Sequence, residues 1–199
     1  MNPYESFIHK SRYARYLQEE GRRETWEETV DRYFQFMEEV CPIPASLRTA
    51  VLVRDVVPSM RSLMTSGPAL ERDHMAGYNC SYITVDHVRA FDENLYVLLC
   101  GTGVGFSVER QYIGKLPEVA NEFHDTDSVI KVRDSKIGWA SALRELVSLL
   151  YSGAVPQLDF SRIRPAGSRL KVFGGRASGS EPLERLFNLR PEAFRNILI

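Results

Sequence analysis

Cys80 is the residue of this sequence whose surroundings best suit redox chemistry. It lies in the stretch 78–82 (YNCSY), whose aromatic and polar residues are typical of a strand. A small buried thiol is the commonest fate of an intracellular cysteine. A redox role would need a second thiol with its Cα within about 7 Å. Cys41 and Cys100 are both expected to lie in the core, so a redox partner of Cys80 is expected on another chain.

The glycine stretch 101–105 (GTGVG) is a second candidate site. A dinucleotide-binding fingerprint follows a strand and opens a helix, whereas this stretch follows a predicted helix and opens a predicted strand. No Gly-Lys-Ser/Thr follows, so it is not a P-loop. The residues alone favour a tight helix-to-strand connection. The alternative is a place where a ligand approaches the backbone closely, since glycine has no Cβ.

The segment 160–180 is rich in glycine and arginine and contains no acidic residue. Guanidinium groups and free backbone amides on such a loop suit phosphate oxygens. A solvated basic loop is the usual outcome for a run of charges, but the density of glycine, serine and arginine favours an anion site here. The basic residues are Arg162, Arg164, Arg169, Lys171 and Arg176.

The elements that position these residues alternate between helix and strand behind a helical N-terminal region, which is an α/β pattern with too few strands to close a barrel. Thr25 with Glu28 forms a capping-box pattern that starts a helix, and 41–44 (CPIP) ends it. Pro58 is expected to interrupt a helical stretch, and Ser59 after it is more simply an N-cap than a ligand donor. Further helices are expected at 46–64, 91–100, 135–151, 181–188 and 191–198, strands at 78–85 and 106–109, and irregular chain at 117–134.

Composition excludes several classes of protein. Apolar residues make up 44% of the 199, enough for a core, and the formal charge of −1 argues against general binding to nucleic acid. No apolar run is long enough for a membrane span, and the N-terminus lacks the order of a secretory signal. Three widely spaced cysteines make a disulfide framework improbable and favour a reducing cytoplasm. The cysteines and histidines lack the spacing of a zinc site.

Several stretches, in order from about residue 11 to about residue 187, resemble the adenosylcobalamin-dependent (class II) ribonucleotide reductases, in particular the monomer-type ribonucleoside-triphosphate reductases. Asn79-Cys80 stands where that family has its first redox cysteine, and 100–108 (CGTGVGFSV) resembles the glycine turn before its second barrel strand. The other similar stretches are 11–17 (SRYARYL) and 25–30 (TWEETV) near the family's start, 134–139 (DSKIGW) at a following helix, and 159–167 and 173–179 around effector loop 1.

The resemblance implies a helical N-terminal region at 1–70 and, at 71–199, the opening strands of a ten-stranded α/β reductase barrel. It covers only the front part of the family. The thiyl cysteine, the second reducing cysteine and most of the cobalamin surface come later in family members. A split enzyme is therefore expected, a heterodimer in which a second chain carries the C-terminal half and completes the barrel. A truncated product is the alternative.

The resemblance also implies a function, the reduction of ribonucleoside (tri)phosphates to 2′-deoxyribonucleotides for DNA replication by thiyl-radical chemistry. Cys80 would be one of two reducing cysteines. Adenosylcobalamin would be bound mainly by the second chain, an external thiol would reduce the enzyme, and a dNTP would be an allosteric effector; no nucleic acid or membrane would be a partner. Substrate residues would be Ser59, Asn79, Gly101, Thr102 and Gly103, and effector residues Asp86, Arg164, Arg169 and Lys171.

Two points leave alternatives open. Monomer-type relatives carry an insertion that helps form the effector site, between the glycine turn and the helix at 134–139, and only 110–133 fill that interval here. Effector binding therefore does not follow from the resemblance alone. The second functional hypothesis is a non-catalytic nucleotide-binding or regulatory module derived from the reductase front half.

Overall fold

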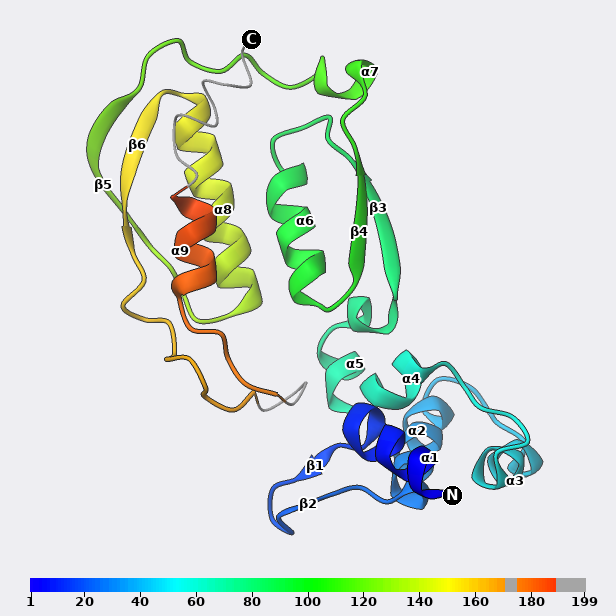
Figure 1. The fold of residues 1–199 in the computed structure, drawn as a ribbon. Coiled ribbons are helices and arrows are strands. Elements are labelled where there is room, and N and C mark those ends of the chain that lie inside the picture. The colour runs from blue at the N-terminus through cyan, green and yellow to red at the C-terminus, as the bar shows by residue number, and fades with distance from the viewer. Residues whose placement is uncertain (171–174, 189–199) are drawn as a thin grey trace. The chain divides into compact units, whose positions relative to one another are not determined.

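The computed structural model describes residues 1–170 and 175–188, which form two compact units (Figure 1). The first unit is Met1–Asn79 with Leu170, and the second is built from Cys80–Arg169 and the described residues after 174. The first is mainly helical, whereas the second alternates strands with helices. The chain is therefore α/β, as its sequence predicts. The division into domains at 1–70 and 71–199 stays a prediction.

Short helices and one small hairpin build the first unit. The predicted capping box is confirmed: the Glu28 amide donates to Thr25 Oγ1 at 3.2 Å, and the Thr25 amide donates to Glu28 Oε2 at 2.7 Å. The predicted break at Pro58 is also confirmed, because it falls between two helices. The elements are α1 (Pro3–Ile8), the π-helix η1 (His9–Tyr13), β1 (Tyr16–Leu17), β2 (Arg22–Arg23), α2 (Trp26–Glu38), α3 (Ala45–Val53), α4 (Met60–Thr65), α5 (Pro68–Arg72) and the 3₁₀ helix η2 (His74–Gly77).

A buried polar network lies beside the apolar core of this unit. Glu24, only 4% exposed, accepts hydrogen bonds from Arg32 Nε at 2.7 Å and Nη2 at 2.9 Å, and from the Thr29 hydroxyl at 3.1 Å. His9 Nε2 lies 2.8 Å from the same hydroxyl. Burial alone would raise the pKa of Glu24, but these bonds, that from the Arg15 amide and the charge of Arg32 hold it below its ordinary value. Burial lowers the pKa of His9.

The second unit contains two β-α-β arrangements. In the first, α6 (Ala90–Leu99) connects the parallel strands β3 (Cys80–Thr84) and β4 (Gly103–Ser107), and α7 (Arg110–Ile113) follows. In the second, α8 (Lys136–Tyr151) connects the parallel strands β5 (His124–Lys131) and β6 (Ala154–Asp159), and α9 (Glu181–Phe187) comes later. The helices α6 and α8 pack against each other and each lies against its own strand pair (Figure 1).

The core of the second unit is concentrated on the β5–β6 side. Its buried cluster is formed by strands β5 and β6, helix α8 and the two apolar residues that α9 contributes, Leu183 and Phe187. Asp92 on α6, only 2% exposed, accepts two hydrogen bonds from Arg144 on α8, at 3.0 and 2.6 Å. None of the described cluster residues belongs to β3 or β4. The strand pair that carries Cys80 is therefore the more thinly covered of the two.

Several predictions about single elements were wrong. The interval 117–134, expected to be irregular, contains β5, and the second predicted strand begins at Gly103 rather than at residue 106. In β5 only Ile130 is buried, so the strand has no run of alternating apolar residues to reveal it. Cys41, expected in the core, is exposed because α2 ends at Glu38 and leaves it in the following turn. The helix predicted at 191–198 lies outside the described residues.

The buried network predicts that acidification destabilises the protein in two steps. A group whose pKa is lowered by folding stabilises the protein above its unfolded pKa, and that stability is lost as the pH falls. We expect a first loss below about pH 6.5 from His9 and a second below about pH 4.5 from Glu24. Urea unfolding of the full chain at pH 7.5 and 5.5 measures the first step. His9→Gln should shrink this difference, and the exposed control His74→Gln should not; equal differences in both would contradict the account.

Candidate functional site

Cys80 is the first residue of β3 and is exposed, with a free thiol. Its register partner on the parallel strand β4 is Gly103. Along β3 the exposed residues Cys80 and Tyr82 alternate with half-buried ones, so both side chains project from the same face of the strand. The predicted strand around Cys80 is thus confirmed, and it presents the thiol rather than burying it.

The glycine stretch is a helix-to-strand connection that ends next to Cys80. Gly101 follows α6 with a φ of 83°, a conformation that glycine adopts without strain, and its amide donates to the Leu98 carbonyl at 2.9 Å. Thr102 is 1% exposed, and β4 begins at the following residue. The Ser81 hydroxyl donates to the Gly103 carbonyl at 3.2 Å. The loop is thus the tight helix-to-strand connection that the residues favour. It also places backbone without side chains next to the Cys80 thiol, so the alternative of close approach by a ligand stays open.

Cys100 cannot act as an exposed thiol in this structure. It is fully buried at the end of α6, as predicted, and its Sγ lies 3.5 Å from Lys136 Nζ. None of the three cysteines forms a disulfide. Cys80 is thus the exposed thiol of the second unit.

Ser59 and Asn79 both lie in the first unit, near the start of α4. Ser59 is the N-cap residue predicted from the sequence, although its side chain makes no capping hydrogen bond. Asn79 Oδ1 accepts a hydrogen bond from Arg61 Nε at 3.2 Å, and Arg61 is in the first turn of α4. The two side chains that the sequence assigns to substrate in this unit therefore gather at one helix turn.

The predicted effector residues do not form one cluster. Asp86 lies after β3 and pairs with Lys115 at 3.6 Å, whereas Arg164 Nε donates to Asp134 Oδ2 at 2.7 Å. Arg169 forms an isolated antiparallel bridge with Arg176. Lys171 lies outside the described residues. Arg164 therefore holds its loop against the residue that precedes the cap of α8, whereas Arg169 and Arg176 are exposed, and Arg176 Nη1 donates to the Gly167 carbonyl at 2.9 Å.

Two residues of the Cys80 face were not singled out from the sequence. Tyr82 stands two positions after Cys80 in the predicted strand, and its register partner is Gly105. The period of two along a strand was the signal that could have identified the tyrosine. Gly105 was identified only as part of a turn, because its place opposite Tyr82 depends on strand pairing.

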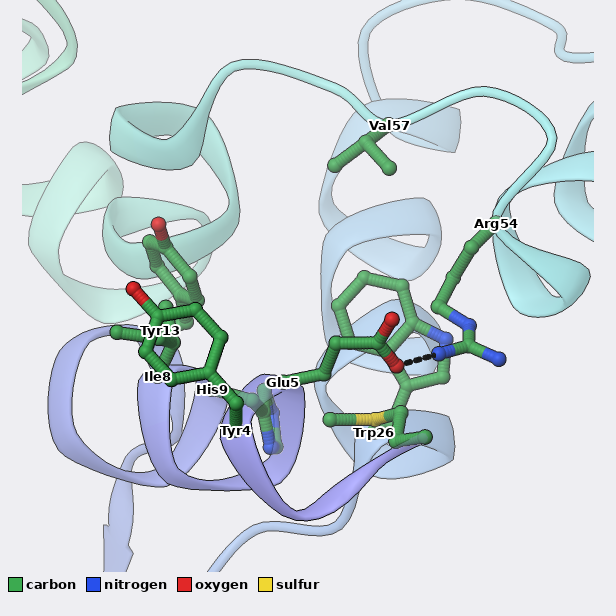
Figure 2. A pocket seen from close by; sticks show the side chains of 9 residues that line it. Tyr4, Glu5, Ile8, His9, Tyr13, Trp26, Arg54 and Val57 are labelled. Carbon is green, nitrogen blue, oxygen red and sulfur yellow. Dashed lines mark hydrogen bonds and ion pairs between the residues drawn. The ribbon is translucent and has the colours of Figure 1, made fainter.

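A small pocket lies in the first unit (Figure 2). It has a volume of about 200 Å³, and Glu5 pairs with Arg54 across it. Arg54 ends α3 with a φ of 70°, in the left-handed region. The lining residues are Met1, Tyr4, Glu5, Ile8, His9, Tyr13, Trp26, Arg54 and Val57. Within 1–170 and 175–188, no group of three or more His, Cys, Asp or Glu side chains is arranged for a metal ion, and no helix could span a membrane.

Comparison with known proteins agrees with this arrangement. The family model of the insertion domain of B12-dependent ribonucleotide reductase matches residues 110–190. A Mycobacterium phage D29 protein described as an adenosylcobalamin-dependent ribonucleoside-triphosphate reductase is 28% identical over 92% of this chain and 32% of its own length. The corresponding reductase of Lactobacillus leichmannii is 26% identical over 88% of this chain and 33% of its own length.

The chain is similar to the front part of the B12-dependent ribonucleotide reductases. A crystal structure of a class II ribonucleotide reductase matches 92% of this chain and 35% of its own, with a TM-score of 0.77 and 24% identity, which shows the shared fold. The present chain spans about a third of the length of the relatives that it matches. Insertion-domain sequence extends well beyond 110–133, the interval expected from the sequence. The alignment with the Lactobacillus leichmannii reductase runs over 247 residues, more than the 199 of this sequence. The Lactobacillus leichmannii protein therefore carries residues in the aligned region that this chain lacks.

The burial of the three thiols predicts how they react with iodoacetamide in the native chain. We expect Cys41 and Cys80 to be alkylated readily and Cys100 to react at least about a hundredfold more slowly, because it reacts only through an opening of the fold. Peptide mass spectrometry over a time course measures each rate, and repeating it in denaturant should make the three rates similar. A Cys80 that reacts as slowly as Cys100 in the native chain would contradict its placement.

Proposed function

We propose that this chain forms the front part of an adenosylcobalamin-dependent ribonucleoside-triphosphate reductase and supplies one of its two reducing cysteines, Cys80. The observation that carries the proposal is the exposed free thiol beside Gly103, at the start of a parallel strand. About nine-tenths of this chain aligns with adenosylcobalamin-dependent reductases. Cysteines that form no disulfide suit the reducing conditions of the cytoplasm.

The chemistry proposed for Cys80 needs a second thiol. Reduction of the ribose at C2′ replaces the C2′–OH bond by C2′–H and releases the oxygen as water. The two electrons come from two thiols, which lose their protons and become a disulfide. Cys100 is buried, and we assign the second thiol to the second chain; an external thiol reductant restores the pair.

Adenosylcobalamin would supply the radical that starts turnover in the complete enzyme. The pocket of the first unit, at about 200 Å³, is far too small for a corrinoid with its adenosyl and nucleotide arms. That pocket therefore does not fit the cofactor, and no step of this chain is derived through it. We assign its binding mainly to the rest of the reductase.

The strand pair β3–β4 supports the proposal that another polypeptide completes the fold. Parallel strands are usually buried on both faces, yet Tyr82, Phe106 and Val108 are 56–65% exposed in and directly after this pair. Open strand edges also tend to pair with further strands. We propose that a second chain with the rest of the reductase supplies those strands, the thiyl cysteine and the second reducing cysteine. Such an obligate interface should bury more than about 2,000 Å².

The remaining predicted residues have separate places in this proposal. Ser59 and Asn79, at the start of α4, and the backbone of 101–103 would bind the ribonucleoside triphosphate. The basic loop would bind a dNTP effector through the exposed Arg169 and Arg176, with Lys171 beside them in sequence. Asp86 and Arg164 would hold the segments around that site, since each is already in an ion pair.

The Cys80→Ser variant tests the proposal in the complex reconstituted with the second chain, adenosylcobalamin, a thiol reductant and each ribonucleoside triphosphate. We expect deoxyribonucleotide formation over many turnovers to fall at least about a thousandfold, because the reducing pair is lost. The control Cys41→Ser should keep full activity, since Cys41 is assigned neither to the reducing pair nor to substrate or effector. Undiminished turnover by Cys80→Ser would refute the assignment. Binding of dNTP without activity in any reconstitution would favour the regulatory module.

A further inference from the structure

The exposed face of β3 and β4 combines two side chains with two glycines. Cys80 and Tyr82 project from the same face of β3. Their register partners on β4 are Gly103 and Gly105, both of them exposed. We call these two residues the glycine floor. The face therefore has a thiol and an aromatic ring along one strand, and bare backbone along the other.

The structure of this unit does not itself require glycine at position 105. Gly105 lies outside the positive-φ region, so its backbone would accept any L residue. A Cβ added there would meet Tyr82 Cδ2 and the Ser81 carbonyl at 3.8 Å, which is ordinary van der Waals contact. Glycine inside a strand is destabilising relative to alanine, because it loses more conformational freedom on folding. A glycine without a local cause marks a place where a ligand or another backbone approaches closely.

Tyr82 is an aromatic strand residue with most of its surface exposed. The residue is 65% exposed, and among the described residues it has no hydrogen bond and no ring partner. Its ring lies beside Gly105, at one end of the glycine floor. Two residues along a strand span about 6.6 Å, so a sugar ring placed on the floor reaches both the thiol and the tyrosine.

We propose that Tyr82 is a substrate-positioning residue of the reductase. Its ring packs against the sugar of the ribonucleotide over the glycine floor and holds C2′ toward the Cys80 thiol. This inference rests on the proposed function of Cys80 and extends it to a residue that does not take part in the electron transfer. The contact is one of packing, so the ring is needed and the phenol hydroxyl is not.

The test measures how ribonucleotide protects Cys80 from iodoacetamide in the reconstituted complex. We expect protection in the wild type, with the label at Cys41 as an internal control. Tyr82→Ala should raise the ribonucleotide concentration for half-protection at least about tenfold, and Tyr82→Phe should keep the wild-type value. A thermal melt of each variant checks folding, which a largely exposed position should tolerate.

A second pair of variants tests the glycine floor without removing the ring. Gly105→Ala makes only ordinary contacts within the chain, so it should fold normally, but its Cβ occupies space over the floor and should weaken protection. Gly105→Leu fills the floor and should weaken protection as Tyr82→Ala does. In steady-state assays, we expect Tyr82→Ala to raise KM about tenfold with a smaller change in kcat, since the reacting thiol is intact.

The outcomes separate this inference from the proposed function. Wild-type half-protection in Tyr82→Ala would overturn the positioning role, as would a loss in Tyr82→Phe equal to that in Tyr82→Ala. Absence of ribonucleotide protection in the wild-type complex would overturn it too. If the complex forms no deoxyribonucleotide but protection still depends on Tyr82, the reductase assignment fails and the positioning role stands.

Discussion

The parallel pairing of β3 with β4 decides what the Cys80 thiol can meet. Its register sets Cys80 beside Gly103 and Tyr82 beside Gly105, so one strand presents side chains and the other leaves space. A shift of one residue would turn the thiol to the opposite face and remove it from the glycines. The left-handed Gly101 ends α6 and starts the return of the chain to this register. The proposed chemistry thus depends on a connection of a few residues between a helix and a strand.

The packing of α6 on α8 supports that pairing from behind. Asp92 is buried on α6 and is paired with Arg144 of α8, so the first β-α-β arrangement is tied to the better-packed second one. Asp92 Oδ1 has no hydrogen-bond partner among the described groups. Removal of Arg144 would leave a buried carboxylate without its counter-charge, which is a costly arrangement. The match of the insertion-domain model to 110–190 covers the α8 side of this contact.

Local signals in the sequence predicted much of this structure. The Thr25–Glu28 box and the break at Pro58 each depend on residues close together in the chain, and both are confirmed. Strand β5 was missed because its residues show no alternation of apolar and polar side chains. Its pairing with β6, about 30 residues away, is not visible in the local sequence. The exposure of Cys41 was missed because a cysteine beside a proline gives no local sign of burial. Cys80 could be identified from the sequence. The position of Gly103 and Gly105 beside the Cys80 face depends on strand register and could not be predicted.

If Cys80 is a reducing thiol, it must be oxidised to a disulfide when one ribonucleotide is reduced. A single-turnover experiment measures this oxidation. The pre-reduced complex would be mixed with adenosylcobalamin and ribonucleoside triphosphate without external thiol, then quenched and digested for disulfide mapping. The account predicts one deoxyribonucleotide for each Cys80 that becomes disulfide-bonded, while Cys41 and Cys100 stay reduced. Deoxyribonucleotide formed while Cys80 remains a free thiol would contradict it.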